Sequence, residues 1–185
     1  MDGQIRLPGE AFILAGGGSR RFGSDKARYE LRGRPMIQCI ADTLAATCER
    51  VTVVAKEAGA YADLGLNTVA DHYSQQSPLS GVLTALELAG SAWAFICACD
   101  LPQLTGELCR RLWQQRAGWG VVPSTAGRLH PLAAWYHHDS LPHLLAAYRE
   151  GHLSLRRSLE HQKFTIIEWD QPEILLNLNR LPEGE

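Results

Sequence analysis

The 185-residue chain lacks the features of a secreted, membrane-spanning or nucleic-acid-coating protein. No apolar run approaches the roughly 18 residues needed to cross a bilayer, and the first ten residues, MDGQIRLPGE, hold no apolar signal-peptide core. The formal net charge is only −2, which gives no general attraction to nucleic acid or anionic lipid. We therefore expect a soluble, cytoplasmic protein that binds neither nucleic acid nor membrane, and any site for a polyanion must be local.

Residues suited to metal binding, redox chemistry or covalent catalysis are also few. The closest cysteine pair is spaced C-x-C rather than C-x-x-C, and the number of cysteines is odd: Cys39, Cys48, Cys97, Cys99 and Cys109. The seven histidines show no metal-ligand spacing, and no Ser-His or Cys-His arrangement suggests a covalent nucleophile. We expect buried, reduced thiols and a reaction without a covalent intermediate.

The chain has no internal repeat, no low-complexity segment and no Pro/Gly/Ser-rich linker. With 45% hydrophobic and 21% charged residues, it is long enough for one full-sized core and somewhat short for two. The expectation is a single domain over residues 1–185.

Apolar runs bounded by turn residues alternate with helical patterns along the chain. The expected strands are Ala11–Leu14, Val51–Ala55, Asn67–Ala70, Trp93–Ala98, Gly120–Pro123, Leu132–Tyr136 and Phe164–Glu168. The expected helices are Pro35–Cys48, Leu79–Ala89, Thr105–Ala117 and Ser140–Glu150, with Arg156 and Arg157 in a further helical stretch. This alternation predicts an α/β fold, a three-layer α/β/α Rossmann-like sandwich with a mostly parallel central sheet.

The first expected strand leads into a glycine-rich stretch, GGGSRRFGSD, within the segment AFILAGGGSRRFGSDKARYE. The dinucleotide fingerprint G-x-G-x-x-G fails at Arg21, and the Walker motif fails because Ser24 and Asp25 follow Gly23. What remains is a glycine turn whose N–H groups can approach an anion, followed closely by the cations Arg20, Arg21 and Lys26. The stretch predicts a phosphate-binding loop, and the alternative is a glycine-rich turn whose basic residues are merely solvated.

The same stretch resembles the signature L-A-G-G-x-S-x-R-M-G-x-x-K of small nucleotidyltransferases with a glycosyltransferase-A-like fold (the nucleotide-diphospho-sugar transferase-like fold). Within them it is similar to the molybdenum cofactor guanylyltransferases. Phe22 replaces the usual methionine, and the matching positions are Leu14, Ala15, Gly16, Gly17, Arg20, Gly23 and Lys26. Further landmarks follow in the family's order: Ala70-Asp71, SPLSGVLTALE, CACDLPQL, HPLAAWY and NLN. The resemblance implies that Leu14, Ala15, Gly16 and Gly17 wrap the nucleotide while Arg20 and Lys26 hold its phosphates.

Asp100 follows an expected strand, and Pro102 then ends the extended run. Mg²⁺ prefers one or two carboxylates together with phosphate oxygens, so Asp100 is expected to hold Mg²⁺ against a nucleoside triphosphate; an Asp-x-Pro turn without a ligand is the alternative. The resemblance also implies a metal and phosphate role for Asn179, beside Asn177. Here NLNRLPE departs by one position from the family's N-x-N-T-P-E, and an ordinary polar turn is the other interpretation.

The base and the acceptor are assigned by resemblance. Asp71 is implied as a nucleotide contact, and a carboxylate can accept the two adjacent N–H donors of guanine. The cytidylyl-transferring relatives tend to carry alanine at the position of Gly16, and the smaller residue leaves room for a purine. His130, Arg156, Arg157 and Asn177 are the candidate acceptor contacts, although a histidine beside proline is commonly a turn residue and a helical Arg pair is commonly a solvated face.

The implied reaction transfers GMP from GTP to the terminal phosphate of molybdopterin or Mo-molybdopterin with release of pyrophosphate. Arg20, Lys26 and Asp100 are the expected catalytic residues and Mg²⁺ the expected cofactor. A GTP-binding accessory protein and molybdoenzyme chaperones are conceivable partners. Three alternatives stay open: transfer of a cytidylyl group, transfer of a nucleotidyl group to a sugar phosphate, and a nucleotide-binding regulatory module without turnover.

Overall fold

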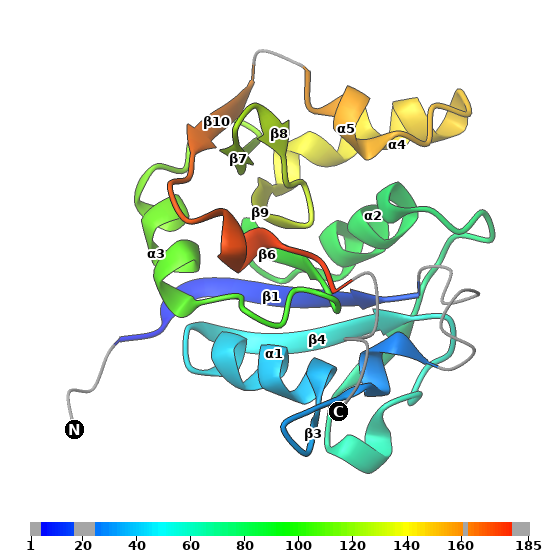
Figure 1. Ribbon diagram of the computed structural model, residues 1–185. Helices are drawn as coiled ribbons and strands as arrows, with labels where there is room; N and C mark the ends of the chain where they lie inside the picture. The colour runs from blue at the N-terminus through cyan, green and yellow to red at the C-terminus, as the bar shows by residue number, and fades with distance from the viewer. Residues whose placement is uncertain (1–4, 17–24, 161–162, 179–185) are drawn as a thin grey trace.

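A computed structural model describes residues 5–16, 25–160 and 163–178 of the chain (Figure 1). Within these residues an eight-stranded sheet has the strand order β10-β7-β9-β6-β1-β4-β5, with β8 paired to β7. The strands of this sheet are β1 (Leu7–Ala15), β4 (Cys48–Ala55), β5 (Thr68–Ala70), β6 (Trp93–Ala98), β7 (Gly120–Thr125), β8 (Arg128–Leu129), β9 (Ala133–His137) and β10 (Phe164–Glu168). A separate two-stranded hairpin pairs β2 (Glu30–Leu31) with β3 (Arg34–Pro35).

Helices lie on both faces of the sheet. The described α-helices are α1 (Met36–Ala45), α2 (Pro78–Leu88), α3 (Gly106–Gln114), α4 (Leu141–Arg149) and α5 (Leu155–Ser158). One buried cluster joins α1 and α3 to the sheet through residues such as Ala11 and Ile13. A second joins α2, α4 and α5 to the opposite face through residues such as Phe12 and Ile96 (Figure 1). Neighbouring strand residues point to opposite faces, and this produces the expected three-layer sandwich.

Most strands run in the same direction. β1 is parallel to β4 and β6, β4 is parallel to β5, and β7 is parallel to β10. β9 runs antiparallel to both β6 and β7, and β8 antiparallel to β7. The expectation of a mostly parallel sheet is therefore confirmed, and β1, β4, β5, β6, β7 and β10 all end at one edge, called the carboxyl edge below.

β1 starts earlier than the expected strand at Ala11, because the sheet tolerates Pro8 and Gly9. The register between β1 and β4 shifts between Leu7 and Glu10, and such an irregularity accommodates a residue that cannot donate a ladder hydrogen bond. A Cβ at Gly9 would lie 2.6 Å from the Trp135 ring. The Pro-Gly pair thus marks a close approach of Trp135 within a strand.

Two expected helix ends were wrong. The helix expected to reach Cys48 ends at Ala45, and Cys48 already begins β4; the Thr47 hydroxyl donates to the Thr43 carbonyl at the turn, 2.8 Å away. The helix expected to reach Ala117 ends at Gln114, where the Arg116 guanidinium caps the Trp113 carbonyl at 2.6 Å. In both places a side chain satisfies a terminal carbonyl that the next helical turn would have used. No helix among the described residues is long and apolar enough to span a membrane.

Candidate nucleotide-binding site

Three of the site residues predicted from the sequence follow strands that end at the carboxyl edge. Gly16 follows β1, Asp71 follows β5 and Asp100 lies two residues beyond β6. His130 reaches the same edge from the loop before β9, since β9 runs in the opposite direction. In an open α/β sheet ligands bind at the carboxyl ends of the strands, so the topology brings these four residues to the place where a ligand is expected.

Asp100 connects three distant parts of the chain. Its Oδ2 accepts a hydrogen bond from Lys26 Nζ at 2.7 Å, and its Oδ1 accepts one from Asn177 Nδ2 at 2.7 Å. The Asp100 carbonyl also accepts from the Leu178 amide at 2.9 Å. The Lys26 and Asp100 side chains are only 13% and 16% exposed. A cation, a carboxylate and an amide that lie 74 and 77 residues apart in sequence therefore form one polar centre.

The donor set at Asp100 fits Mg²⁺. Carboxylate and amide oxygens are hard ligands, and Mg²⁺ usually needs only one or two carboxylates when phosphate oxygens and water complete its shell. The described residues contain no cluster of three or more His, Cys, Asp and Glu side chains suited to holding a metal by themselves. A single carboxylate such as Asp100 suits a metal that arrives with a phosphate ligand.

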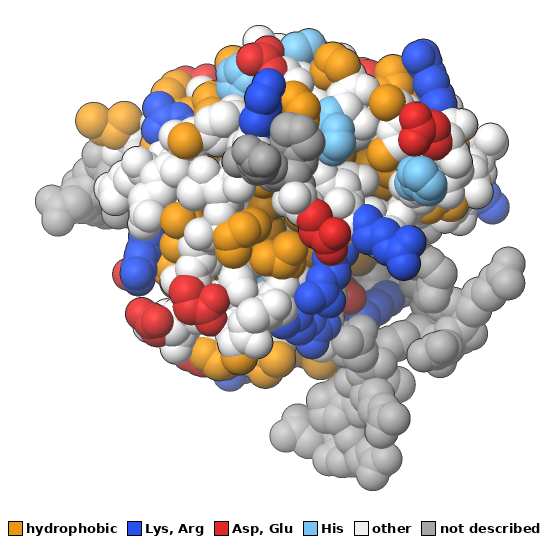
Figure 2. All heavy atoms as spheres, turned by 90° about the horizontal axis from the view of Figure 1, so that it is seen from above, with side chains coloured by type: hydrophobic (Ala, Val, Ile, Leu, Met, Phe, Trp, Pro, Cys, Tyr) orange, Lys and Arg blue, Asp and Glu red, His pale blue; other side chains and the backbone are white. Residues whose placement is uncertain are grey.

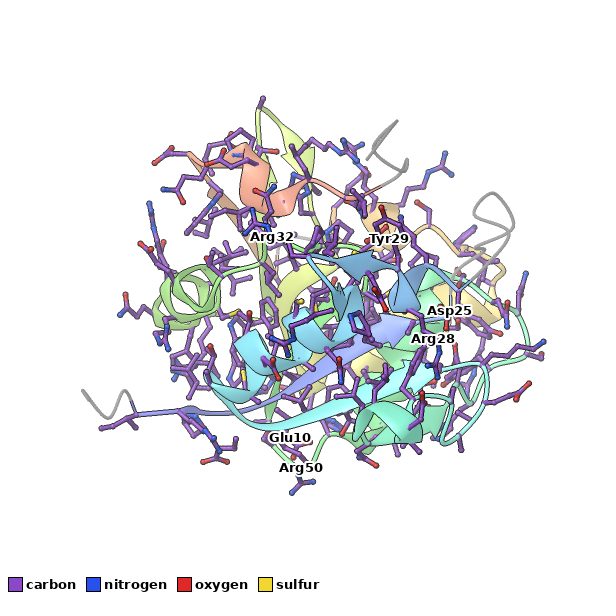
Figure 3. All side chains as sticks on the ribbon, turned by 60° about the horizontal axis from the view of Figure 1, so that its bottom comes forward. Glu10, Asp25, Arg28, Tyr29, Arg32 and Arg50 are labelled. Carbon is purple, nitrogen blue, oxygen red and sulfur yellow. The ribbon has the colours of Figure 1, made fainter. Side chains whose placement is uncertain are left out.

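Lys26 begins a short 3₁₀ turn, η2 (Lys26–Arg28), directly after the glycine-rich stretch. Asp25 caps this turn, because its Oδ1 accepts from the Ala27 amide at 3.0 Å. Figure 3 shows Asp25 and Arg28 close together at one end of the molecule, away from Glu10 and Arg50. In the space-filling view, several Lys and Arg side chains lie together on the face shown (Figure 2). Positive charge of this kind favours an anionic ligand.

The amino end of α2 packs tightly against the end of β1. A Cβ at Gly81 would lie 2.9 Å from Cδ1 of Leu14, so a larger residue at this position would require the Leu14 side chain to move. A capping box begins the helix: the Ser77 hydroxyl accepts from the Ser80 amide at 3.1 Å and the Ser80 hydroxyl accepts from the Ser77 amide at 3.0 Å. The stretch SPLSG therefore supplies the cap and the first turn of α2, together with the glycine that lies against β1 at the border of the site.

Asp71 already accepts several hydrogen bonds from the protein. Its Oδ1 accepts from the Thr84 hydroxyl at 2.6 Å and from the Tyr73 amide at 3.1 Å, and its Oδ2 accepts from the Ser80 hydroxyl at 3.0 Å. A carboxylate has about four acceptor positions, so Oδ2 retains room for one more donor beyond these contacts. To accept two donors of a base at once, Asp71 would also have to share an acceptor position that one of these three protein donors already uses.

The candidate acceptor residues occupy different surroundings. His130 Nε2 lies 2.6 Å from the Thr125 hydroxyl, and burial, assisted by the nearby Arg128, lowers the pKa of His130. A neutral imidazole at this edge offers a hydrogen bond rather than a positive charge. Arg156 and Arg157 are exposed on α5. Asn177 donates to Asp100 and so lies on the Asp100 side of the candidate site.

No activated thiol lies beside Asp100. Burial and the neighbouring Asp100 and Asp25 carboxylates raise the pKa of Cys99 to about 12, and the five cysteines are free. Since the thiolate is the reactive form, the raised pKa disfavours a reactive Cys99 at neutral pH. Cys48, Cys97 and Cys109 are buried, as expected, whereas Cys39 and Cys99 are only partly buried.

Gly17, Arg20 and Asn179 lie outside the described residues, so their predicted roles stay predictions. Sequence reasoning missed Ser80 and Thr84, which are fully buried and bind Asp71. Two hydroxyls four positions apart on an otherwise apolar helix face were the signal that a polar partner had to lie opposite them, because buried hydroxyls need hydrogen bonds.

Comparison with known proteins identifies what the chain resembles. Residues 11–165 match the family model described as MobA-like NTP transferase domain. A relative named probable molybdenum cofactor guanylyltransferase, from Deinococcus radiodurans, is 34% identical over 181 residues, which are 94% of this chain and 91% of the relative.

Two solved structures share the fold. A putative protein from Aquifex aeolicus VF5 matches with a TM-score of 0.83 and 26% identity over 97% of both chains. Molybdopterin-guanine dinucleotide biosynthesis protein A from Archaeoglobus fulgidus matches with a TM-score of 0.77 and 19% identity over 92% of both chains.

Proposed function

Since the chain belongs to the family of MobA-like NTP transferase domains, we propose that it transfers GMP from GTP to the terminal phosphate of molybdopterin or Mo-molybdopterin. Pyrophosphate is the second product. The proposal treats residues 1–185 as one nucleotidyltransferase domain acting in the cytoplasm. The name of the Deinococcus radiodurans relative supports the acceptor and the nucleotide.

One observation supports this chemistry most strongly: the Lys26–Asp100 pair at the carboxyl edge, with N···O 2.7 Å. A triphosphate needs fixed cations, and a metal that accompanies it needs a carboxylate. Both groups lie side by side, directly after the glycine-rich stretch and directly after β6. In the structure Lys26 and Asp100 pair with each other; with a nucleotide bound, Lys26 would contact phosphate oxygens and Asp100 would hold the metal.

In the proposed reaction an oxygen of the acceptor phosphate attacks the α-phosphorus of GTP. A new phosphorus–oxygen bond forms as the bond from the α-phosphorus to the bridging oxygen breaks, and the electron pair leaves with pyrophosphate. Mg²⁺, when bound at Asp100, supplies neutralisation of the charge on the phosphate oxygens. Lys26 stabilises the same charge, and no base is needed because a phosphate monoester is already largely ionised near neutral pH. The protein acts by positioning and electrostatics.

Asp71 and Gly16 support guanine as the base. Oδ2 of Asp71 has room for a donor, and Gly16 is exposed at the end of β1 with no side chain to occupy the space above it. His130, Arg156 and Arg157 remain the proposed acceptor contacts, with His130 acting as a hydrogen-bonding group. A GTP-binding accessory protein and molybdoenzyme chaperones remain conceivable partners.

The deciding experiment measures pyrophosphate release from labelled GTP and Mg²⁺ with and without molybdopterin. We expect release that depends on the acceptor, together with formation of a guanine dinucleotide product. Parallel reactions with CTP and ATP test the base, and a sugar phosphate tests the other acceptor class. Binding of GTP without turnover under every condition would instead indicate a regulatory nucleotide-binding module.

A further inference from the structure

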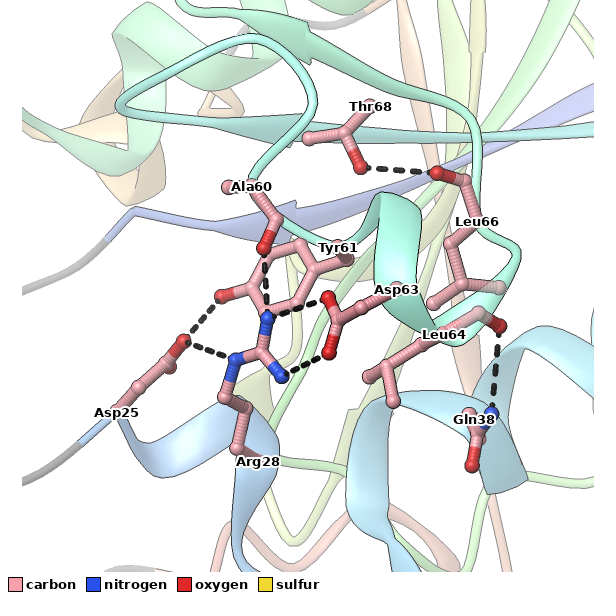
Figure 4. A network of polar contacts seen from close by, with 9 residues as sticks. All are labelled: Asp25, Arg28, Gln38, Ala60, Tyr61, Asp63, Leu64, Leu66 and Thr68. Carbon is pink, nitrogen blue, oxygen red and sulfur yellow. Dashed lines mark hydrogen bonds and ion pairs between the residues drawn. The ribbon is translucent and has the colours of Figure 1, made fainter.

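A network of polar side chains joins the turn that carries Lys26 to the connection between β4 and β5 (Figure 4). On one side lie Asp25 and Arg28, which flank Lys26. On the other side lie Tyr61 and Asp63, around the 3₁₀ turn η3 (Ala62–Leu64). None of these four residues belongs to the nucleotide site proposed above, and the resemblance to known families assigned no role to them.

The Asp25 carboxylate accepts two hydrogen bonds and also pairs with Arg28, whose Nε lies 3.8 Å from Oδ2. Oδ1 accepts from the Ala27 amide at 3.0 Å and so starts η2, while Oδ2 accepts from the Tyr61 hydroxyl at 2.8 Å. Tyr61 is only 2% exposed, and its burial, with the hydrogen bond to Asp25, holds its pKa far above the usual range. Its hydroxyl therefore remains a proton donor to Asp25. Because the Tyr61 ring is held in the core, the hydroxyl fixes the orientation of the carboxylate that caps the turn.

Arg28 is held by the same connection. Its two terminal nitrogens donate to the two Asp63 oxygens, each at 2.8 Å, and one of them also donates to the Ala60 carbonyl at 2.8 Å. The guanidinium lies 5.2 Å from the centre of the Tyr61 ring. Two cations that lie only two residues apart thus bind different parts of the protein: Arg28 pairs with Asp63 in the connection between β4 and β5, and Lys26 pairs with Asp100 at the candidate site.

We propose that Tyr61, acting through Asp25, and Arg28, acting through Asp63, are positioning residues that hold η2 so that the Lys26 ammonium is presented to Asp100 and the triphosphate. The inference rests on the proposed role of Lys26 in nucleotide binding. The Arg28 and Asp63 side chains are 38% and 60% exposed, and ion pairs with this much exposure contribute little to stability. Their bidentate geometry instead restricts a turn whose lysine must be correctly oriented before the ligand arrives.

The first test uses Tyr61→Phe, which keeps the buried ring and removes only the hydroxyl. In the absence of nucleotide, labelling of Lys26 by an amine-acetylating reagent, followed by mass spectrometry, should become about three- to tenfold faster than in the unmodified protein, as expected for loss of one hydrogen bond that orders the turn. Unchanged labelling of Lys26 would overturn the inference, whatever the protein does with GTP.

The second test is GTP binding by calorimetry without Mg²⁺. Tyr61→Phe should weaken binding by about three- to tenfold, and in a protein already carrying Lys26→Ala it should cause no further loss. An equal loss in both backgrounds would show that Tyr61 acts independently of Lys26 and would overturn the inference. If Lys26→Ala alone left GTP binding intact, the proposed phosphate role of Lys26 would fail, while the labelling experiment would still decide whether Tyr61 positions it.

Arg28→Gln provides a second variant at the surface, with Arg34→Gln as its matched control. Arg34 forms a pair with Asp42 at 2.6 Å and is 56% exposed, so the control removes the same chemical group from an ion pair in the hairpin and α1. We expect faster Lys26 labelling and weaker GTP binding in Arg28→Gln, with thermal unfolding shifted no more than in Arg34→Gln. Identical behaviour of the two variants in all three measurements would overturn the role of Arg28.

Discussion

At the scale of single residues, the side chains of the carboxyl edge differ in how much of their bonding capacity the protein itself uses. Both carboxylate oxygens of Asp100 have protein partners, as do both of Asp71. Among the described residues, a Cβ at Gly16 would meet nothing nearer than the Lys56 amide at 3.9 Å. Substitutions at the two aspartates therefore disturb the protein as well as the ligand, whereas a substitution at Gly16 tests the ligand alone.

Gly16→Ala is expected to leave stability unchanged and to alter base preference. The added methyl fits the protein at ordinary contact distance, so the unfolding temperature should stay the same, but the methyl fills space proposed for the purine. GTP binding should weaken by about tenfold relative to CTP binding, the size of effect typical for one methyl group in a binding pocket. Calorimetry with both nucleotides in the presence of Mg²⁺ measures the ratio, and an unchanged ratio would refute a steric role for Gly16.

His130 should make the protein less stable as the pH falls below neutrality. In the unfolded chain the imidazole has a pKa of about 6.5. In the folded protein, burial and the nearby Arg128 lower the pKa of His130, and Glu168 acts in the opposite direction. Between these two values the unfolded state binds more protons, so stability is complete above about pH 6.5 and declines as the pH falls toward the lower folded pKa.

The measurement compares urea unfolding at pH 7.5, 6.5 and 5.5 for the unmodified protein and His130→Gln. The variant should lose less stability on acidification, because the contribution of His130 is gone. Direct titration of the His130 ring protons by NMR gives the pKa itself. A value at or above 6.5 would contradict the expected direction.

At the scale of elements, the amino end of α2 connects the cap of a helix to the proposed base contact. Ser77 and Ser80 form the capping box, and Ser80 additionally donates to Asp71. Gly81 then allows the helix to lie against Leu14 at the end of β1. The helix start, the β1 end and Asp71 are therefore fixed relative to one another by contacts within a single turn of α2.

Comparing Ser77→Ala with Ser80→Ala separates the cap from the Asp71 contact. Each variant breaks one side of the capping box and should lower the free energy of unfolding by about 0.5–2 kcal/mol. Only Ser80→Ala also removes a hydrogen bond to Asp71, so only this variant should reduce the preference for GTP over ATP. Denaturant unfolding and nucleotide binding are measured on both proteins; equal preference in the two variants would argue against base recognition by Asp71.

At the scale of the whole molecule, Asp100 holds together the turn after the glycine-rich stretch, the end of β6 and the last described segment of the chain. Lys26 and Asn177 lie 74 and 77 residues away from Asp100 in the sequence. Their meeting at one carboxylate means that binding at Asp100 involves residues from nearly the full length of the described chain.

Lys26→Ala and Asp100→Ala should have opposite dependence on metal. Lys26→Ala should weaken GTP binding with or without Mg²⁺. Asp100→Ala should abolish the Mg²⁺ dependence and leave metal-free binding unchanged or tighter, because Asp100 no longer competes with phosphate for Lys26. Both should lower turnover by roughly 10² or more. Calorimetry and the pyrophosphate assay measure these effects.

Asp42→Ala is the control for these variants, since Asp42 pairs with Arg34 at the surface and lies 64% exposed. It should leave both binding and turnover as they are. Full activity of Lys26→Ala would show that Lys26 only pairs with Asp100 and does not bind the triphosphate.

Much of the fold could be predicted because its signals are local. Trp93–Ala98 and Phe164–Glu168 form strands with the expected bounds, since apolar runs between turn residues need no distant information. The start of β1 and the ends of α1 and α3 could not be predicted in the same way. They depend on Trp135 against Gly9 and on the Thr47 and Arg116 side chains meeting particular carbonyls.

The sequence by itself determined the alternation of strands and helices, the glycine stretch with its cations, and the carboxylates placed after strands, because periodicity and residue chemistry are written in neighbouring positions. Only the tertiary structure decided which groups meet: Lys26 and Asn177 at Asp100, Ser80 and Thr84 at Asp71, and Arg28 at Asp63. The physical reason is that hydrogen bonds and ion pairs depend on distances of a few ångströms. For residues tens of positions apart, those distances are set by sheet order and helix packing rather than by local sequence.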